Sequence, residues 1–370
     1  MALSSFMQRA LAAATRVRGR TSSNPWVGAV LVRDGEVIGE GATAPPGGDH
    51  AEAAALRGID ALNAELYVTL EPCSPFDGKR TPPCAQMVID SGVRRVVVAM
   101  LDPDQRVSGR GVAILRDAGV RVEVGDGEDE AVQLVRPYLK HIQTGLPYVI
   151  AKFAASLDGR TATADGDSKW ITGEAARDHS HQQRAWVAAV MTGSGTVLAD
   201  DPSLTARPGG ELAQHQPVRV ILDSRGRTPA SATVFRRPGT VIVATSKSAP
   251  SAWKQAIANL GANVIDCETA SDGLNLNQLL ATLGQRNIGS VWVEGGGSLL
   301  GSLLAGEHAD EVWAYLAPIL IGRDGLPALG GLGVRTVADS LRLSNIVVER
   351  LSTDILIRGN AGSWAPRLVS

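Results

Sequence analysis

Aromatic residues are scarce in this chain of 370 residues, at 4% of the total, and the formal net charge is only −2. A nucleic-acid-binding surface normally needs an excess of basic residues or aromatic rings on which bases can stack. The composition therefore argues against a nucleic-acid partner. Chemistry on a small molecule is the better expectation.

Cysteine is also scarce, with three residues: Cys73, Cys84 and the isolated Cys267. Three cysteines cannot form a disulfide framework, and they are typical of a reducing compartment. No apolar run approaches the roughly 20 residues that span a bilayer, and no secretory hydrophobic segment is evident. Apolar residues at helical spacing in Met1–Arg20 predict a first helix instead of a targeting peptide. We expect a cytoplasmic protein with no membrane partner.

The length exceeds what one hydrophobic core usually supports, and 44% hydrophobic residues can build two cores. Helical periodicity runs to about residue 143, Gly145-Leu146-Pro147 interrupts it, and a new apolar strand pattern begins at Tyr148. We therefore expect two domains, residues 1–145 and 146–370.

The first domain alternates predicted strands and helices. Asp34-Gly35 lies between two apolar runs and is a strong hairpin signal. Strands are predicted at 27–32, 37–40, 66–70, 96–100 and 120–124, and helices at 51–56, from 84 onward, at 111–118 and at 130–143. Alternation after an opening hairpin predicts a mixed sheet with helices on both faces.

Three segments of this domain supply one imidazole, one carboxylate and two thiols. They are His50-Ala51-Glu52, Pro72-Cys73 and Pro82-Pro83-Cys84. A catalytic zinc site uses three protein ligands and leaves the fourth position open, so we assign His50, Cys73 and Cys84 as ligands. Zinc supplies a hydroxide nucleophile near neutral pH, and Glu52, which is not a ligand, would move protons as the catalytic acid and base.

Each part of this set is weak evidence by itself, because free cysteines are often merely buried and His-x-Glu is common by chance. Together they predict a hydrolytic zinc deaminase. Ten residues separate Cys73 from Cys84, whereas the broad deaminase signature has two between its cysteines. This spacing argues against an ordinary cytidine, adenosine or transfer-RNA deaminase.

The residues around both cysteines, Thr69–Ser74 and Gly78–Ala85, closely resemble the bifunctional pyrimidine deaminase and reductase of riboflavin biosynthesis. Residues Thr21–Gly28 also look like that family's segment, and the resemblance implies that Asn24 contacts the pyrimidine. The resemblance further implies that Lys79 contacts the substrate. Lys79 lies between the two cysteines, in a loop that is lengthened by Pro75-Phe76-Asp77. The implied fold of this domain is the three-layer α/β/α cytidine-deaminase fold.

The second domain resembles the reductase half of the same family, whose α/β fold is similar to that of dihydrofolate reductase. The matching segments are Ala154–Arg160, Ser168–Thr172 and Thr196–Arg207. The resemblance implies NADPH as cofactor. It places Ala154, Trp170, Thr196, Asp200 and Ser224 against NADPH, and Lys152, Ser168, Arg184, Leu204, Arg207 and Glu294 against the substrate.

Part of this assignment has independent physical support. A phosphorylated sugar needs cationic and hydroxyl donors such as those of Arg184, Arg207 and Ser168, although a single arginine is more often a solvated surface group. Val291–Leu300 predicts a strand, a glycine loop and a helix, in which Gly296, Gly297 and Ser298 would meet the cofactor phosphates. A plain tight turn is the alternative, and Leu300 excludes the Rossmann fingerprint.

We therefore expect a zinc- and NADPH-dependent enzyme with two steps. The first would deaminate 2,5-diamino-6-(5-phosphoribosylamino)pyrimidin-4-one, and the second would reduce the ribosyl side chain to give 5-amino-6-(5-phosphoribitylamino)uracil. One alternative is a reductase with a structural deaminase-like domain, and another is a noncatalytic flavin-pathway binding module. We also expect a homo-oligomer, although no residue pattern sets the number of subunits.

Overall fold

The computed structural model describes residues 3–368 except 22–23, 76–81, 105 and 272. The chain divides into two compact units, Met1–Gly145 with Ala365–Ser370, and Leu146–Trp364. The expected second domain ran to residue 370, and the structure differs there. The Gln143 side chain donates to the carbonyl of Arg367 at 2.8 Å and accepts from its amide at 3.2 Å, which ties the end of the chain to the first unit.

The first unit contains a five-stranded sheet with the order β2-β1-β3-β4-β5. Its strands are β1 (Gly28–Arg33), β2 (Glu36–Ala42), β3 (Glu65–Val68), β4 (Arg95–Val98) and β5 (Arg121–Val124). β1 is antiparallel to β2 and β3, whereas β3, β4 and β5 are parallel. Asp34 and Gly35 both have positive φ, as the predicted two-residue hairpin requires. The predicted mixed sheet is confirmed.

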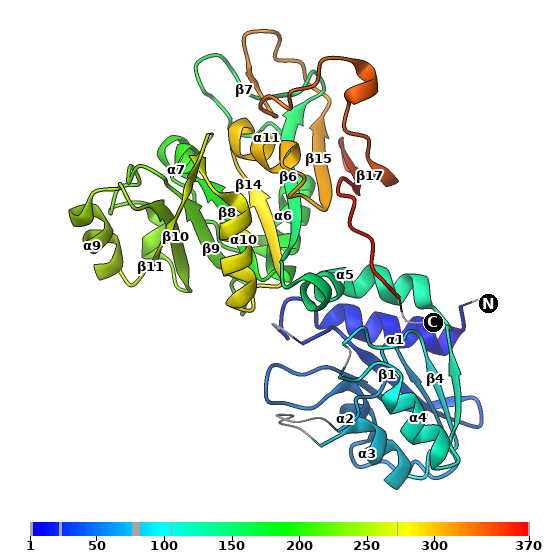
Figure 1. Ribbon diagram of the computed structural model, residues 1–370. Helices are drawn as coiled ribbons and strands as arrows, with labels where there is room; N and C mark the ends of the chain where they lie inside the picture. Colours follow the sequence, from blue (N-terminus) through cyan, green and yellow to red (C-terminus); the bar gives the residue numbers. More distant parts are fainter. Residues whose placement is uncertain (1–2, 22–23, 76–81, 105, 272, 369–370) are drawn as a thin grey trace. The chain divides into compact units, whose positions relative to one another are not determined.

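Helices cover both faces of this sheet (Figure 1). They are α1 (Ser5–Arg16), α2 (Ala51–Leu56), α3 (Cys84–Asp90), α4 (Arg110–Asp117) and α5 (Glu128–Thr144). α1 and α5 lie on one face and α2, α3 and α4 on the other. α1 approaches β1 so closely that a Cβ on Gly28 would lie 1.9 Å from the carbonyl oxygen of Ala10. α1 is shorter than predicted because turns replace the helix after Arg16.

The second unit is built on a nine-stranded sheet with the order β11-β10-β9-β8-β14-β6-β15-β18-β17. Its strands are β6 (Tyr148–Ser156), β8 (Ala189–Gly193), β9 (Val218–Leu222), β10 (Val241–Ser246), β11 (Asn263–Cys267), β14 (Ser290–Glu294), β15 (Glu311–Ala317), β17 (Ser344–Leu351) and β18 (Asp354–Asn360). β18 is antiparallel to both of its neighbours, and the other described pairs are parallel. Two short ribbons, β7 (Arg160–Ala162) with β16 (Leu326–Pro327) and β12 (Thr269–Ala270) with β13 (Gly273–Leu274), complete the strands.

Helices pack on this sheet to form two hydrophobic clusters. The α-helices are α6 (Glu174–Trp186), α7 (Ser194–Asp200), α8 (Thr233–Arg236), α9 (Ser251–Asn259), α10 (Leu276–Gln285) and α11 (Gly297–Ala305), with 3₁₀ turns at Pro208–Gly210 and Val337–Asp339. Trp292, at the middle of the sheet, is fully buried. None of the described helices is long and apolar enough to cross a membrane.

The strand order of the second unit determines where a ligand can bind. β14 is inserted between β8 and β6, although it follows both of them in the chain (Figure 1). In open parallel sheets, ligands bind beyond the carboxyl ends of strands where the order reverses. The ends of β6, β8 and β14 therefore mark the place to look for a site.

Candidate active sites

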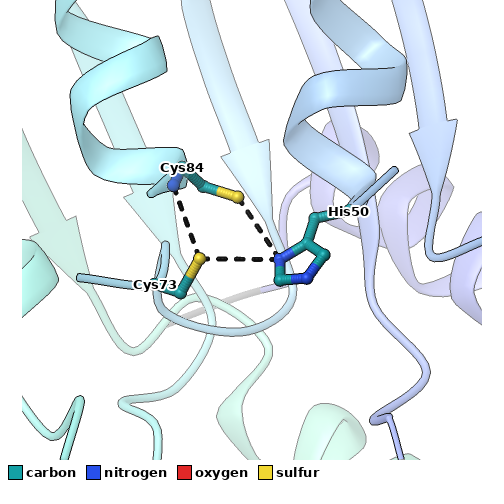
Figure 2. Close-up of side chains that lie close together, drawn as sticks. All are labelled: His50, Cys73 and Cys84. Carbon is teal, nitrogen blue, oxygen red and sulfur yellow. Dashed lines mark hydrogen bonds between the residues drawn. The ribbon is translucent and has the colours of Figure 1, made fainter. Parts of the chain in front are cut away.

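Figure 2 shows that His50, Cys73 and Cys84 converge from two helix starts and one loop. His50 immediately precedes α2, Cys84 is the first residue of α3, and Cys73 lies in the loop after β3. His50 Nδ1 is 3.5 Å from Cys73 Sγ and 3.4 Å from Cys84 Sγ. The Cys84 amide also donates to Cys73 Sγ at 3.4 Å. The structure thus brings together the three residues assigned as metal ligands.

The donor set and its spacing fit zinc. One imidazole nitrogen and two sulfurs lie within 4.8 Å of one another. Zinc binds nitrogen at about 2.0 Å and thiolate sulfur at about 2.3 Å, so tetrahedral ligand atoms are separated by about 3.5 Å. The two nitrogen-to-sulfur distances already match this separation. Three protein ligands leave one position for a water molecule, as in catalytic sites.

Glu52 lies beside this set without belonging to it. It occupies the first turn of α2, two residues after His50, and its side chain is only 3% exposed. Burial, with a further contribution from Cys73, raises the pKa of Glu52 to about 7. A buried carboxyl group adjacent to the metal ligands is therefore present, as the sequence predicts for the acid and base.

Glu71 organises the loop that carries Cys73, although it was not among the residues predicted for the site. Its buried carboxylate accepts the amides of Asp102 at 3.1 Å, Gly109 at 2.8 Å and Val112 at 3.1 Å. The loop also packs tightly against α4, since a Cβ on Gly111 would lie 1.9 Å from the carbonyl oxygen of Pro72. Glu71 thereby fixes the chain two residues before a metal ligand.

Replacing Glu71 by leucine is expected to release this loop. Two buried amides and one half-buried amide would lose their acceptor, and an unsatisfied buried donor costs about 1–3 kcal/mol. Hydrogen exchange of the full-length variant should show loss of protection at Asp102, Gly109 and Val112. The amides of β1 serve as the internal control, and unchanged protection of all three target amides would contradict the assigned role.

The other predicted residues of this domain are less informative. The backbone N–H of Asn24 donates to the Thr21 carbonyl at 3.0 Å, and the Thr21 hydroxyl donates to the backbone carbonyl of Asn24 at 2.8 Å. Its contact with a pyrimidine stays a prediction. Lys79 lies outside the described residues.

The second unit has a cavity of about 530 Å³ at the expected edge of its sheet. It lies against residues 152–154 of β6 and the carboxyl end of β14, and it extends along α6 and α7. Most residues predicted for a site in this unit line it: Lys152, Ala154, Ser168, Trp170, Arg184, Thr196, Asp200, Leu204, Glu294 and Gly296. The structure thus gathers residues that are up to 144 positions apart in the sequence, from Lys152 to Gly296.

Glu294 is the centre of the charge network in this cavity. Arg184 donates to it through two nitrogens, at 2.5 and 2.7 Å, and the Trp292 indole donates at 2.7 Å. Lys152 on β6 is the register partner of Glu294 on β14, and its Nζ lies 3.5 Å from Glu294 Oε2. These cationic partners hold the pKa of Glu294 far below its usual range despite burial. Glu294 is therefore an ionised carboxylate that orients Arg184.

Arg207 does not line this cavity directly. It donates to the hydroxyls of Ser203 at 2.6 Å and Thr205 at 2.5 Å, and it lies 3.5 Å from His181 Nε2. His181 does line the cavity, and burial with the nearby charges of Arg184 and Arg207 lowers its pKa to about 4. Sequence reasoning missed His181. The only available signal was its position three residues before Arg184, nearly one helical turn away.

A second cavity of about 690 Å³ adjoins the first, and Gly195, Thr196 and Gly296 line both. The predicted cofactor residues Ser224 and Ser298 line only the second one. In the described part of the chain, Gly297 lines neither of the two cavities. A Cβ there would lie 2.9 Å from the Gly330 amide nitrogen, so its lack of a side chain permits packing against that segment. Gly296 has open space beside it, as close approach of a ligand requires.

Comparison with known proteins gives the same division of the chain. Residues 2–100 match the family model of the cytidine and deoxycytidylate deaminase zinc-binding region, and residues 147–357 match that of the RibD C-terminal domain. The riboflavin biosynthesis protein RibD of Bacillus amyloliquefaciens is 41% identical over 354 residues, which cover 95% of this chain and 94% of that protein. This chain belongs to the RibD family.

Other relatives extend the likeness to structure. RibD of Escherichia coli (strain K12) is 40% identical over 367 residues, covering 95% of this chain and 97% of the relative. The structure of Acinetobacter baumannii RibD, form 1, aligns with a TM-score of 0.86 at 41% identity, covering 96% of this chain and 97% of that one. A Thermotoga maritima structure, described as a diaminohydroxyphosphoribosylaminopyrimidine deaminase and 5-amino-6-(5-phosphoribosylamino)uracil reductase, aligns with a TM-score of 0.84 at 35% identity and covers the same shares.

These matches confirm the predicted architecture of this RibD family member. An N-terminal domain like cytidine deaminase, with a zinc-binding region, precedes a reductase domain of the NADPH-using RibD type. The chain is a bifunctional deaminase and reductase of riboflavin biosynthesis.

Proposed function

We propose that the first domain deaminates 2,5-diamino-6-(5-phosphoribosylamino)pyrimidin-4-one and that the second reduces the deaminated product to 5-amino-6-(5-phosphoribitylamino)uracil. The observation that carries the proposal is the convergence of His50, Cys73 and Cys84 beside buried Glu52, in a chain whose second domain holds a separate charged cavity. The Thermotoga maritima relative is described with the same two activities.

In the deaminase site, His50, Cys73 and Cys84 would hold zinc, which supplies a hydroxide nucleophile at neutral pH. Glu52 would accept the proton of the attacking water and pass protons to the ring nitrogen and the departing amine. The new carbon–oxygen bond replaces the carbon–nitrogen bond, and ammonia leaves. Asn24 and Lys79 would hold the pyrimidine substrate.

In the reductase site, NADPH would supply a hydride to C1 of the ribosyl group. The ring carbon–oxygen bond opens, and Asp200 or water would supply the proton that completes the ribityl chain. The chain's own residues would align the two reactants. Arg184, held by Glu294, and Arg207, held by Ser203 and Thr205, provide positive charge for a phosphorylated sugar. The remaining substrate contacts would be Lys152, Ser168, Leu204 and Glu294, and the cofactor contacts Ala154, Trp170, Thr196, Asp200, Ser224, Gly296, Gly297 and Ser298.

We also propose a cytoplasmic homo-oligomer. The cytoplasmic location is supported by the scarcity of cysteine, which suits a reducing compartment. Self-association can be tested by light scattering of the purified chain. A mass of 38.7 kDa, that of one chain, would exclude self-association at the concentration used.

A coupled assay tests the function. Full-length protein supplied with the diamino substrate and NADPH should release one ammonia for each NADPH oxidised, and ammonia release should continue when NADPH is withheld. A reductase with a structural first domain would oxidise NADPH only with substrate that was already deaminated. A binding module would do neither, so either result contradicts the proposal.

A further inference from the structure

One face of α6 lines the first cavity of the reductase domain, and it carries two basic residues besides Arg184. The residues of this face, which recur at the spacing of successive helical turns, are Ala176, Arg177, Ser180, His181 and Arg184. The Arg177 guanidinium is already engaged, since it lies 4.3 Å from the centre of the Trp170 ring and donates to the Thr172 carbonyl. His181 is the other basic side chain of this face, and no role has been assigned to it.

The positive charge next to His181 is uncompensated. Arg184 is neutralised by Glu294, to which it donates through two nitrogens. Arg207 is half-buried, and its guanidinium donates to two hydroxyls, which carry no charge. In the described part of the chain, no carboxylate pairs with Arg207. A partly buried cation without a counter-ion favours an anionic ligand group.

The hydrogen bonds of His181 determine which of its two ring nitrogens carries the hydrogen. The backbone N–H of Arg207 donates to His181 Nδ1 at 3.3 Å, so Nδ1 is an acceptor. Burial and the charges of Arg184 and Arg207 lower the pKa of His181 to about 4, so the imidazole is neutral at neutral pH. A neutral imidazole whose Nδ1 accepts carries its hydrogen on Nε2. His181 Nε2 is therefore a donor.

Two donors thus lie side by side at this part of the cavity. His181 Nε2 is 3.5 Å from Arg207 Nη2, and two donor nitrogens cannot hydrogen-bond to each other. Both can donate to one acceptor group beside them, and a phosphate offers three acceptor oxygens with negative charge. His181 lines the cavity and Arg207 does not, so a ligand in the cavity would meet the imidazole first.

We propose that His181 Nε2 donates a hydrogen bond to the phosphate of the reductase substrate and thereby makes the reductase select phosphorylated over unphosphorylated substrate. The inference rests on the proposed reductase function and deepens it, because it adds a specificity-determining residue to that site. Arg207 supplies the positive charge beside this bond, and its backbone N–H fixes the orientation of the imidazole.

The test compares two substrates in the NADPH oxidation assay of the full-length protein: 5-amino-6-(5-phosphoribosylamino)uracil and the same compound without its phosphate. His181→Asn removes the Nε2 donor but keeps an oxygen near the position of Nδ1, which can accept the Arg207 amide. With the phosphorylated substrate, this variant should lower kcat/KM about 10- to 100-fold, mainly through KM, as expected for a lost hydrogen bond to a charged group. With the unphosphorylated substrate, kcat/KM should change less than about 2-fold.

His181→Gln is the complementary variant. Its amide nitrogen lies near the position of Nε2 and replaces the donor, whereas the acceptor for the Arg207 amide is displaced. This variant should keep most of the preference for the phosphorylated substrate. A purely structural role, in which only the bond from the Arg207 amide matters, predicts the opposite order, with His181→Asn close to wild type and His181→Gln impaired.

His215→Asn is the matched control, because His215 is exposed and does not line the cavity, and it should leave both kcat/KM values unaltered. Both substrates are measured on one preparation, so a smaller folded fraction lowers the two values equally and leaves their ratio unchanged. An unchanged ratio in His181→Asn, or a loss in His181→Gln alone, would overturn the inference. A wild-type protein that oxidises NADPH with neither substrate would instead contradict the proposed reductase function.

Discussion

Replacing Glu52 by glutamine is expected to stop ammonia release while zinc stays bound and NADPH oxidation continues with deaminated substrate. Glutamine keeps the shape of the buried side chain but cannot accept and return a proton. General acid and base catalysis contributes about 10²–10⁴-fold to rate, so a loss of this size is expected. Because Glu52 is not among the three clustered ligands, metal content should not fall.

The measurements are ammonia release, elemental analysis of zinc and NADPH oxidation on one preparation. Glu36→Gln is the matched control, since Glu36 is exposed in the hairpin after Asp34-Gly35 and the same chemical change there should leave all three quantities unaltered. Two results would count against the assignment. One is ammonia release at the wild-type rate, and the other is zinc lost in proportion to activity.

Glu294→Gln is expected to abolish reduction and to destabilise the second domain while deamination is retained. The change leaves buried Arg184 and Lys152 without their carboxylate. The side chains of these two residues and of Glu294 are only 13–16% exposed. Removing one partner of a buried ion pair lowers the free energy of unfolding by about 3–5 kcal/mol. Reduction should fail as well, because Arg184 would lose the group that orients it in the cavity.

Tryptophan fluorescence during urea unfolding can measure this effect in the intact protein. Trp26 is the one tryptophan of seven that precedes residue 146, so the signal reports mainly on the reductase domain. Glu311→Gln is a close control. Glu311 accepts the Trp313 indole at 2.8 Å, much as Glu294 accepts that of Trp292, but no ion pair is found with it in the described part of the chain. The Glu311→Gln variant should lose only about 1 kcal/mol of unfolding free energy. An equal loss in the Glu294→Gln and Glu311→Gln variants would refute the ion-pair argument.

The metal set was predictable because its signals are local. Pro82-Pro83 precedes the helix that begins at Cys84, a glycine cluster precedes the helix after His50, and an apolar strand ends shortly before Cys73. Each residue type also has a narrow chemical meaning. The hairpin at Asp34-Gly35 and the strand, glycine and helix pattern after Val291 were predictable for the same reason.

Contacts between distant segments were not predictable in this way. Glu71 accepts amides that are 31 to 41 residues away, and nothing in the sequence around it indicates those partners. The pairing of Lys152 with Glu294 depends on β14 entering the sheet between two earlier strands. The resemblance could place these residues in a site, but it could not show that Arg184 is already engaged by Glu294.

The return of the last residues to the first unit has a consequence for dissecting this enzyme. The polypeptide leaves the deaminase domain after Gly145 and comes back at Ala365, so two peptide connections join the units. A protease that nicks only one of these connections leaves both halves tethered by the other. Anyone who expresses the reductase alone should end the chain at Trp364, and a separate deaminase fragment that stops at Gly145 would leave Gln143 without its terminal partner.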